Sequence, residues 1–310
     1  MRCALTLGLL AAAVAVGQTK STYTFKKAGD LEIQADVYRP AGDQRLPVVM
    51  WIHGGALIGG HRGNLRDIQM KRYVESGFAV VSIDYRLAPE VKAPVILEDV
   101  RDAYRWIRKD GPKLFHADPK RIAVVGHSAG GYLTLTCGHR LDPRPRALVS
   151  FYGYGDIAAD WYAKPDPFYL KQKLVPKEEA YAAVGGAPIS GATGPTERGR
   201  FYLYCRQQGL WPKEVAGLDP ATQNREFDPY SPARNVTKKF PPTMLLHGDA
   251  DTDVPFAQSE QMDAELTKHG VEHEFIRIPN GPHGFDGRMQ DPQVAATFER
   301  AVAFLKAHLE

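Results

Sequence analysis

Three continuous apolar runs constrain the fold of this chain more than any other feature. They are L-P-V-V-M-W-I-H (46–53), F-A-V-V-S-I-D-Y (78–85) and R-I-A-V-V-G (121–126). Strands that are apolar along their whole length are typical of a parallel sheet covered on both faces. Between the runs, apolar residues recur at helical spacing. This alternation predicts an α/β fold in which helices pack on both faces of a parallel sheet.

Further strand and helix patterns extend this alternation along the chain. Strands are predicted at 147–152, 243–247 and 273–278. Helices are predicted at 95–107, 129–140, 256–269 and 294–305. Two stretches near the N-terminus alternate apolar and polar residues, as half-buried antiparallel edge strands do, at 22–27 and 31–38. Together the patterns predict a mostly parallel sheet of about eight strands.

Residues 154–238 interrupt the alternation, because they lie between two predicted strands and are too many for an ordinary loop. The segment is rich in proline, glycine and aromatic residues, such as Tyr202 and Trp211. We expect an inserted cap over one end of the sheet, with the α/β domain itself comprising 18–153 and 239–310. The alternative is an irregular extension packed on the side of the domain. The aromatic side chains either line a pocket or form the core of the segment.

The N-terminal residues 1–17 have the pattern of a secretory signal peptide. Arg2 supplies a positive charge, the uncharged apolar run 4–16 follows, and the small residue Gly17 suits a cleavage before Gln18. This pattern predicts a secreted or periplasmic protein. The alternatives are an uncleaved anchor or an apolar tail packed on the domain. No later stretch is long and apolar enough to predict a membrane-spanning helix.

The net charge indicates which partners are excluded, and the cysteines indicate whether a disulfide is possible. The net charge is only +3 and no block of lysine and arginine stands out, which argues against a nucleic-acid partner. Cys137 and Cys205 remain after the predicted cleavage and are able to pair in an exported protein. Cys137 lies in an apolar helical stretch, which favours an inert buried thiol instead.

The stretch G-H-S-A-G (126–130) places Ser128 between an apolar run and a predicted helix. A nucleophilic serine must protrude from a sharp strand-to-helix turn, and the residues two before and two after it must be small. The turn also puts the serine at a helix N-terminus, where developing negative charge is favoured. The pattern alone is weak, because glycine and serine are common in turns. Its setting predicts that Ser128 is a catalytic nucleophile.

A second glycine-rich turn, H-G-G-A (53–56), follows the first buried strand. Glycines let the backbone come close to a reacting group, and backbone N–H groups can stabilise an oxyanion. We expect the N–H groups of Gly54, Gly55 and Ala129 to form an oxyanion hole. His53 is expected to hold this loop through a side-chain hydrogen bond.

The base that activates the serine is predicted to be His283, in a loop between the last strand and the final helix. The loop after strand 243–247 offers three carboxylates to orient it, Asp249, Asp251 and Asp253. Our choice is Asp251, with the other two expected to cap the turn. The chain order serine, aspartate, histidine is that of the α/β hydrolases. His247, at the end of that strand, is expected to brace the turn.

These motifs together resemble the esterase and lipase branch of the α/β-hydrolase fold, in the group that includes hormone-sensitive-lipase-like and bacterial feruloyl-esterase-like enzymes. The resemblance rests on H-G-G-A, D-Y-R-L-A-P-E (84–90), G-H-S-A-G-G, H-G-D-A-D-T-D-V-P and G-P-H-G-F, and covers most of the chain. It implies the same nucleophile, acid, base and oxyanion donors. The family often has glycine where Ala56 stands. Asp84, Arg86 and Glu90 are expected to form a structural charged cluster near the site.

The function that the resemblance implies is a secreted serine carboxylesterase acting through an acyl-enzyme, without a metal or cofactor. The expected substrate is a small-molecule or polysaccharide-linked ester with a short-chain, aromatic or carbohydrate acyl group. The alternatives are a prolyl-oligopeptidase-like serine peptidase and a non-catalytic ligand-binding protein on the same scaffold. The aspartates at 249–253 lack the full pattern of an EF-hand calcium loop.

Overall fold

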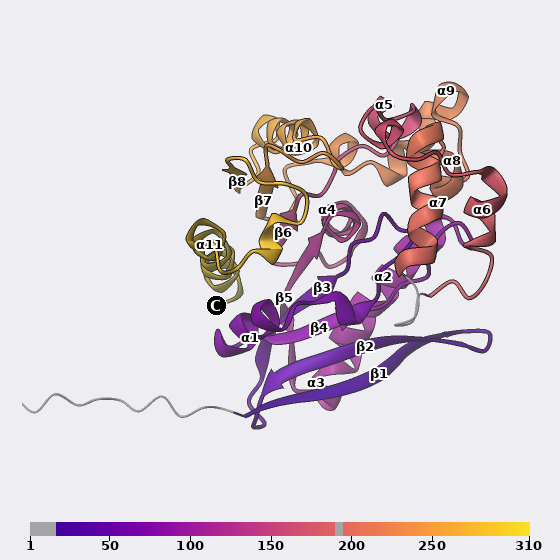
Figure 1. Ribbon diagram of the computed structural model, residues 1–310. Helices are drawn as coiled ribbons and strands as arrows, with labels where there is room; N and C mark the ends of the chain where they lie inside the picture. Colours follow the sequence, from indigo (N-terminus) through magenta and orange to yellow (C-terminus); the bar gives the residue numbers. More distant parts are fainter. Residues whose placement is uncertain (1–16, 190–194) are drawn as a thin grey trace, which may run out of the picture.

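The computed structural model describes residues 17–189 and 195–310 (Figure 1). Within these residues the centre is an eight-stranded sheet in the order β1-β2-β4-β3-β5-β6-β7-β8. Its strands are β1 (Gln18–Ala28), β2 (Leu31–Pro40), β3 (Leu46–Ile52), β4 (Ala79–Ile83), β5 (Ala117–His127), β6 (Leu148–Phe151), β7 (Thr243–Gly248) and β8 (His273–Ile278). β2 pairs antiparallel with both β1 and β4, and the other neighbouring strands are parallel. The predicted mostly parallel sheet with an antiparallel edge is confirmed.

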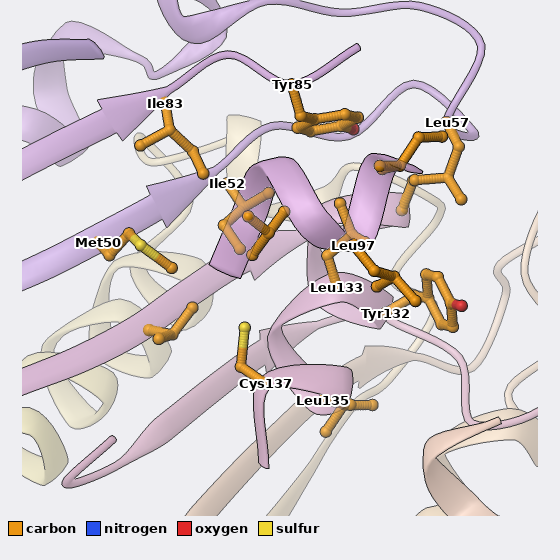
Figure 2. Packing of buried hydrophobic residues seen from close by; sticks show 14 of the residues in the cluster. Met50, Ile52, Leu57, Ile83, Tyr85, Leu97, Tyr132, Leu133, Leu135 and Cys137 are labelled. Atoms are coloured by element: carbon orange, nitrogen blue, oxygen red, sulfur yellow. The ribbon is translucent and has the colours of Figure 1, made fainter. Parts of the chain in front are cut away.

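Helices cover both faces of this sheet, as expected for strands that are apolar throughout. The long helices are α1 (Asp67–Glu75), α2 (Ala93–Lys109), α4 (Ala129–Arg140), α10 (Ala257–Lys268) and α11 (Pro292–Leu309). Alternate residues of β3 divide between two cores. Val49 and Trp51 belong to the core that contains residues of α1 and α11. Met50 and Ile52 belong to the core that contains residues of α2 and α4 (Figure 2).

The predicted helices agree with the observed ones to within a few residues, but α1 has no counterpart in the prediction. Its buried side chains include Gln69 beside Met70, Tyr73 and Val74. A polar residue on the inward face interrupts the apolar stripe that marks an amphipathic helix. The remaining short helical elements outside 154–238 are η1 (Arg62–Asn64), α3 (Gly111–Leu114) and η5 (Phe285–Gly287).

The segment between β6 and β7 folds into helices that lie together at the upper right of Figure 1. They are α5 (Asp160–Ala163), η2 (Tyr169–Lys171), α6 (Lys177–Ala182), α7 (Pro195–Gln208), α8 (Trp211–Ala216), α9 (Pro220–Gln223), η3 (Asn224–Tyr230) and η4 (Pro232–Asn235). Several of its aromatic residues are buried, and the rings of Tyr162 and Trp211 stack with centroids 3.9 Å apart. Some of the aromatic residues considered for a pocket therefore lie in the core of this segment instead.

The prediction of a signal peptide at the N-terminus stays a prediction, whereas the structure decides whether the two cysteines pair. Of the expected signal peptide at 1–17, only Gly17 falls within the described residues. None of the helices described has both the length and the apolar character needed to cross a bilayer. Cys137 and Cys205 are buried free thiols, and burial raises the pKa of each. They are not paired in this structure, and the interpretation of Cys137 as an inert buried thiol is confirmed.

Candidate active site

Ser128 occupies the sharp turn between β5 and α4, with φ 56° and ψ −119°. A positive φ is uncommon for any residue other than glycine and marks a strained backbone. The turn is tight enough to require both flanking glycines. A Cβ on Gly126 would lie 2.2 Å from the carbonyl oxygen of Gly130, and a Cβ on Gly130 would lie 2.0 Å from that of Ile52. The local sequence therefore dictates the protruding serine.

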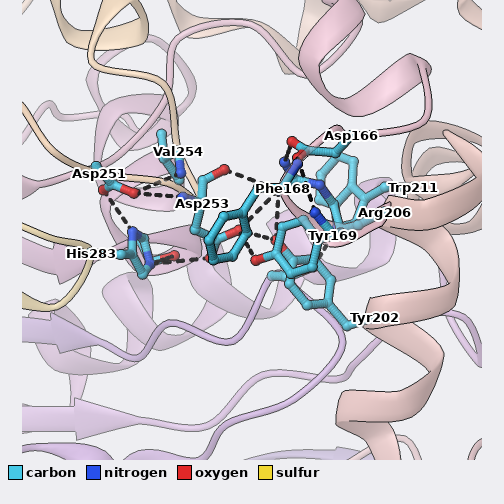
Figure 3. A network of polar contacts seen from close by, with 12 residues as sticks. Asp166, Phe168, Tyr169, Tyr202, Arg206, Trp211, Asp251, Asp253, Val254 and His283 are labelled. Atoms are coloured by element: carbon cyan, nitrogen blue, oxygen red, sulfur yellow. Dashed lines mark hydrogen bonds and ion pairs between the residues drawn. The ribbon is translucent and has the colours of Figure 1, made fainter. Parts of the chain in front are cut away.

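The structure brings Ser128, His283 and Asp251 together. They lie in the turn after β5 and in the loops after β8 and β7, at the carboxyl ends of parallel strands, where α/β folds bind their ligands. His283 Nε2 lies 3.1 Å from Ser128 Oγ. His283 Nδ1 lies 2.7 Å from Asp251 Oδ2 (Figure 3). With the imidazole neutral, Nδ1–H donates to the carboxylate, and Nε2 accepts from the serine hydroxyl. This is the arrangement that activates a serine.

Asp251 also folds the loop that carries it. Its Oδ1 accepts hydrogen bonds from the backbone N–H groups of Asp253, at 2.8 Å, and Val254, at 2.9 Å. Burial would raise the pKa of this carboxyl, but the hydrogen bonds with His247 and His283 outweigh it and hold the pKa well below its usual range. His247 Nε2 also lies 3.1 Å from the carbonyl oxygen of Val254, so the expectation that His247 braces this turn is confirmed.

His283 is surrounded by negative charge. Burial opposes protonation of the imidazole, but the hydrogen bond to Asp251 and the charges of Asp253, Asp251 and Asp286 outweigh it and raise the pKa of His283. The ring of Tyr152 packs edge-on against it, with centroids 4.7 Å apart. An imidazole in this setting readily takes up a proton, which is what a general base beside a serine must do.

The H-G-G-A loop packs directly against the serine turn. A Cβ on Gly54 would lie 3.2 Å from that of Ser128, and Gly55 has φ 108°, in the region that favours glycine. Ala129 is the first residue of α4, so its N–H is one of those that a helix leaves without an intrahelical acceptor. Ala56, the last residue of this motif, adopts φ 55°.

His53 holds this loop, as the sequence predicts. It is fully buried, its ring stacks on Tyr85, and its Nδ1 lies 2.7 Å from the carbonyl oxygen of Gly54. Burial lowers the pKa of His53 to about 4, so the ring is neutral and donates this hydrogen bond through Nδ1–H. On the other side of the loop, Trp211 Nε1–H donates to the carbonyl oxygen of Ala56 at 2.9 Å.

These groups surround a cavity of about 440 Å³. Its wall combines the serine turn, the glycine loop and one helix of the inserted segment, with lining residues that include Gly54, His127, Ser128, Tyr152, Tyr202 and Asp253. The two glycines expected as oxyanion donors lie in this wall beside Ser128 and His283. A small organic ligand can therefore reach the serine.

Asp253 differs from its predicted role. Asp249 does not cap its own turn either, since its Oδ1 accepts from the N–H of Asn280, in the loop after β8, at 2.6 Å. Asp253 does not cap the turn. Its Oδ1 accepts from the hydroxyls of Tyr169, at 2.7 Å, and Tyr202, and its Oδ2 lies 3.4 Å from His283 Nε2 (Figure 3). The prediction was wrong because these donors come from the inserted segment, which the local D-x-D pattern does not reveal.

Asp286 is a second side chain that sequence reasoning missed. It is 1% exposed and lies behind the serine turn. It accepts from Gln69 Nε2, at 2.6 Å, and from the Tyr152 hydroxyl, and its Oδ2 lies 3.1 Å from His127 Nδ1. Burial would raise the pKa of Asp286, but the charge of His127 and these hydrogen bonds lower it. The only sequence signal is its position three residues after His283.

The residues of D-Y-R-L-A-P-E do not form one charged cluster, in contrast to the prediction. Each pairs with a different partner, in the pairs Asp84–Arg62, Arg86–Asp99 and Glu90–Arg198. The last pair matters for the site, because Arg198 belongs to α7 and lines the cavity. Its guanidinium also donates to the carbonyl oxygens of Ala88 and Ile58, which ties α7 to the loop after Ala56.

Within 17–189 and 195–310, no group of three or more His, Cys, Asp or Glu side chains is arranged to hold a metal ion.

Comparisons with known proteins agree with this architecture. The BD-FAE family model matches residues 35–266, and the model of the dienelactone hydrolase family matches residues 226–309. Among solved structures, an α/β hydrolase superfamily protein from Enterococcus faecalis is 24% identical, with a TM-score of 0.72 over 93% of this chain and 99% of that one. Carboxyl esterase 2 from Tuber melanosporum is 25% identical, with a TM-score of 0.69 over 96% of this chain and 89% of that one.

Curated relatives are much longer. The non-reducing polyketide synthase adrD of Penicillium rubens is 29% identical over 342 residues, which cover 94% of this chain but 14% of the synthase. The chain therefore spans about one seventh of that relative's length. What the two proteins share is a region of the size of this α/β domain with its inserted segment.

Proposed function

The chain belongs to the BD-FAE family of α/β-hydrolase esterases, and from this premise we propose that it is a serine carboxylesterase whose nucleophile is Ser128. The observation that carries the proposal is the hydrogen-bonded series from Ser128 Oγ through His283 to Asp251, with separations of 3.1 and 2.7 Å. It opens onto a cavity that the H-G-G-A loop also lines.

The reaction follows from this geometry. Ser128 Oγ attacks the ester carbonyl while His283 Nε2 accepts its proton, and Asp251 stabilises the resulting imidazolium. The N–H groups of Gly54, Gly55 and Ala129 stabilise the oxyanion. His283 then gives the proton to the leaving alcohol, and an acyl group remains on the serine. Water, deprotonated by the same histidine, releases the acid and restores the enzyme.

The inserted segment 154–238 is proposed as a cap that shapes the substrate pocket. In support, Tyr202 and Arg198 of α7 line the cavity together with the glycine loop. The cavity volume of about 440 Å³ suits a short-chain or aromatic acyl group, or an acyl group carried on a carbohydrate.

Replacing the nucleophile tests the proposal directly. The Ser128→Ala variant should lose more than about a thousandfold of kcat for p-nitrophenyl acetate and butyrate, because the attacking oxygen is removed. A fluorophosphonate probe should label the wild-type protein but not this variant. Unchanged circular dichroism verifies the fold, and Ser21→Ala, at an exposed position on β1, should keep full activity. Retained turnover in Ser128→Ala would refute the assignment.

Assays of the wild-type protein also distinguish the esterase from the two alternatives, a serine peptidase and a non-catalytic ligand-binding protein. An esterase should hydrolyse the nitrophenyl esters much faster than amino-acyl p-nitroanilides, whereas a peptidase should show the reverse preference. A purely ligand-binding protein should hydrolyse neither and should resist the fluorophosphonate.

Export is a separate part of the proposal. It is supported by the signal-like pattern of residues 1–17 and by β1, which begins at Gln18, the residue after the proposed cleavage. N-terminal sequencing of the protein recovered from the medium or periplasm of an expressing cell should begin at Gln18. Recovery only from the cytoplasm, with residues 1–17 intact, would contradict export.

A further inference from the structure

Within the described residues, the hydrogen bonds that the Asp253 carboxylate accepts all fall on one of its two oxygens. All the hydrogen-bond donors from the inserted segment meet its Oδ1, namely the hydroxyls of Tyr169 and Tyr202 and the Nη1 of Arg206, which lies at 2.9 Å (Figure 3). The Oδ2 lies 3.4 Å from His283 Nε2, and Asp253 lines the same cavity as Ser128. One oxygen therefore anchors the side chain, and the other is presented to whatever occupies the cavity.

The anchor holds this carboxylate firmly in place. Arg206 is 1% exposed and pairs with Asp166 as well as with Asp253. Its guanidinium lies 4.9 Å from the ring centroid of Tyr162 and 4.7 Å from that of Tyr169, within the range of cation–π attraction. A buried guanidinium between two carboxylates and aromatic faces fixes Asp253 in one orientation.

Asp253 lies beside the position of the leaving group. His283 Nε2 must deliver its proton to the alcohol oxygen of the ester, so that oxygen has to come within about 3 Å of Nε2. Asp253 Oδ2 is 3.4 Å from the same nitrogen. Asp253 Oδ2 and the departing alcohol oxygen therefore both lie next to His283 Nε2, and so close to each other.

An ionised carboxylate can only accept hydrogen bonds. Next to the leaving oxygen it favours a donor on the alcohol, and it disfavours an anion. A hydroxyl on the carbon adjacent to the ester-bearing carbon is placed to meet it, because the two oxygens of such a diol lie about one hydrogen-bond length apart when they are gauche. Monoesters of 1,2-diols, including partly acylated polyols, have this feature.

Accepting the proposed function as its basis, we infer that Asp253 is a specificity-determining residue that selects esters whose alcohol carries a free hydroxyl next to the ester oxygen. Asp253 accepts a hydrogen bond from that hydroxyl through Oδ2 while α7 and η2 hold Oδ1. The inserted segment thus sets the preference for the alcohol, through a carboxylate that belongs to the loop after β7.

The test compares two acetate esters that differ only in this donor, 2-hydroxyethyl acetate and 2-methoxyethyl acetate. Values of kcat/KM are measured by pH-stat and divided by the rate of hydroxide-catalysed hydrolysis of each ester. A hydrogen bond to a charged acceptor should give the wild-type protein a preference of about tenfold or more for the hydroxyl ester. In Asp253→Asn the preference should fall to about twofold or less, with the methoxy ester still hydrolysed.

Asp160→Asn is the matched control, because Asp160 is an exposed carboxylate of the inserted segment that pairs with Lys164 and is not among the residues lining this cavity. It should keep the wild-type preference. A wild-type preference near one overturns the inference without any variant, and so does a preference that persists in Asp253→Asn or vanishes equally in Asp160→Asn. A wild-type protein that hydrolyses the methoxy ester but shows no preference leaves the esterase proposal standing, whereas one that hydrolyses neither ester removes both.

Discussion

Two hydrogen-bond networks, each centred on a carboxylate, lie next to His283. They differ in the part of the chain that supplies the donors and in how far the carboxylate is sealed from the cavity. The network of Asp286 is built from the α/β domain, with donors on α1, at the end of β5 and just after β6. The network of Asp253 takes its donors from η2 and α7 of the inserted segment. The side chain of Asp286 is 2% exposed and that of Asp253 is 20% exposed.

The difference separates a supporting role from a binding role. Both oxygens of Asp286 are engaged by protein donors, so this carboxylate can only stabilise the structure behind Ser128. Asp253 has one oxygen engaged and the other facing the cavity, so it can also meet a ligand. The α/β domain thus supplies the closed network, and the inserted segment supplies the open one.

The largest expected effect comes from removing the closed network. In Asp286→Ala the buried donors of Gln69, Tyr152 and His127 lose their acceptor, and because each unsatisfied buried donor costs about 1–3 kcal/mol, the unfolding free energy should fall by about 3 kcal/mol or more. Urea unfolding followed by fluorescence measures the loss. Glu274→Ala, which breaks a surface pair with Arg300, is the control and should barely shift the midpoint. Similar midpoints for both variants would contradict a structural role for Asp286.

A smaller effect on the unfolding free energy should distinguish the two networks when one tyrosine hydroxyl is removed from each. Tyr152→Phe removes a donor from a sealed carboxylate and should cost about 2 kcal/mol of unfolding free energy. Tyr202→Phe removes a donor from Asp253, which keeps Tyr169 and Arg206 and is open to water, so the cost should be about 1 kcal/mol or less. The same urea experiment ranks them. An equal or reversed order would contradict the conclusion that the Asp286 network is the more closed of the two.

The smallest expected effect is on the pH dependence of activity. His283 must be neutral to act as a base, and its pKa is raised because the Asp251 hydrogen bond and the charges of Asp253, Asp251 and Asp286 outweigh burial. Activity therefore falls as the pH drops through this raised pKa. Replacing Asp253 with asparagine removes one of those charges, so the acidic limb of kcat/KM should move to lower pH.

Asp160→Asn again serves as the control for this profile, and its acidic limb should stay in place. Tyr152, whose ring also packs on His283, is unchanged in both variants. An acidic limb that does not move in Asp253→Asn would show that this carboxylate does not act on the histidine.

The features that the sequence predicts well are those with local causes. The buried strands of the parallel sheet follow from uninterrupted apolar runs, and the turn at Ser128 follows from two glycines that nothing larger can replace. The meeting of Ser128, Asp251 and His283 follows because the carboxyl ends of neighbouring parallel strands share one edge. Each of these predictions uses short stretches of sequence together with general rules for parallel sheets.

The features that the sequence does not predict depend on distant partners. Helix α1 was missed because Gln69 faces inward, and that is reasonable only once Asp286 is known to accept its hydrogen bond. Asp253 looked like a turn residue because its donors come from 154–238, where short helices and loops carry little periodicity. Asp84, Arg86 and Glu90 look like a cluster in sequence but pair with three separate elements.

Asp251 has two structural roles. They decide which inactive variant is suitable for crystallising the protein with an uncleaved ester. One oxygen of Asp251 orients His283, and the other holds the backbone of Asp253 and Val254. Truncating Asp251 therefore releases the loop that presents Asp253 to the ligand, and the trapped complex would show a distorted alcohol pocket. Ser128→Ala removes a single oxygen and leaves that loop intact, so it is the variant in which a bound alcohol group can be interpreted.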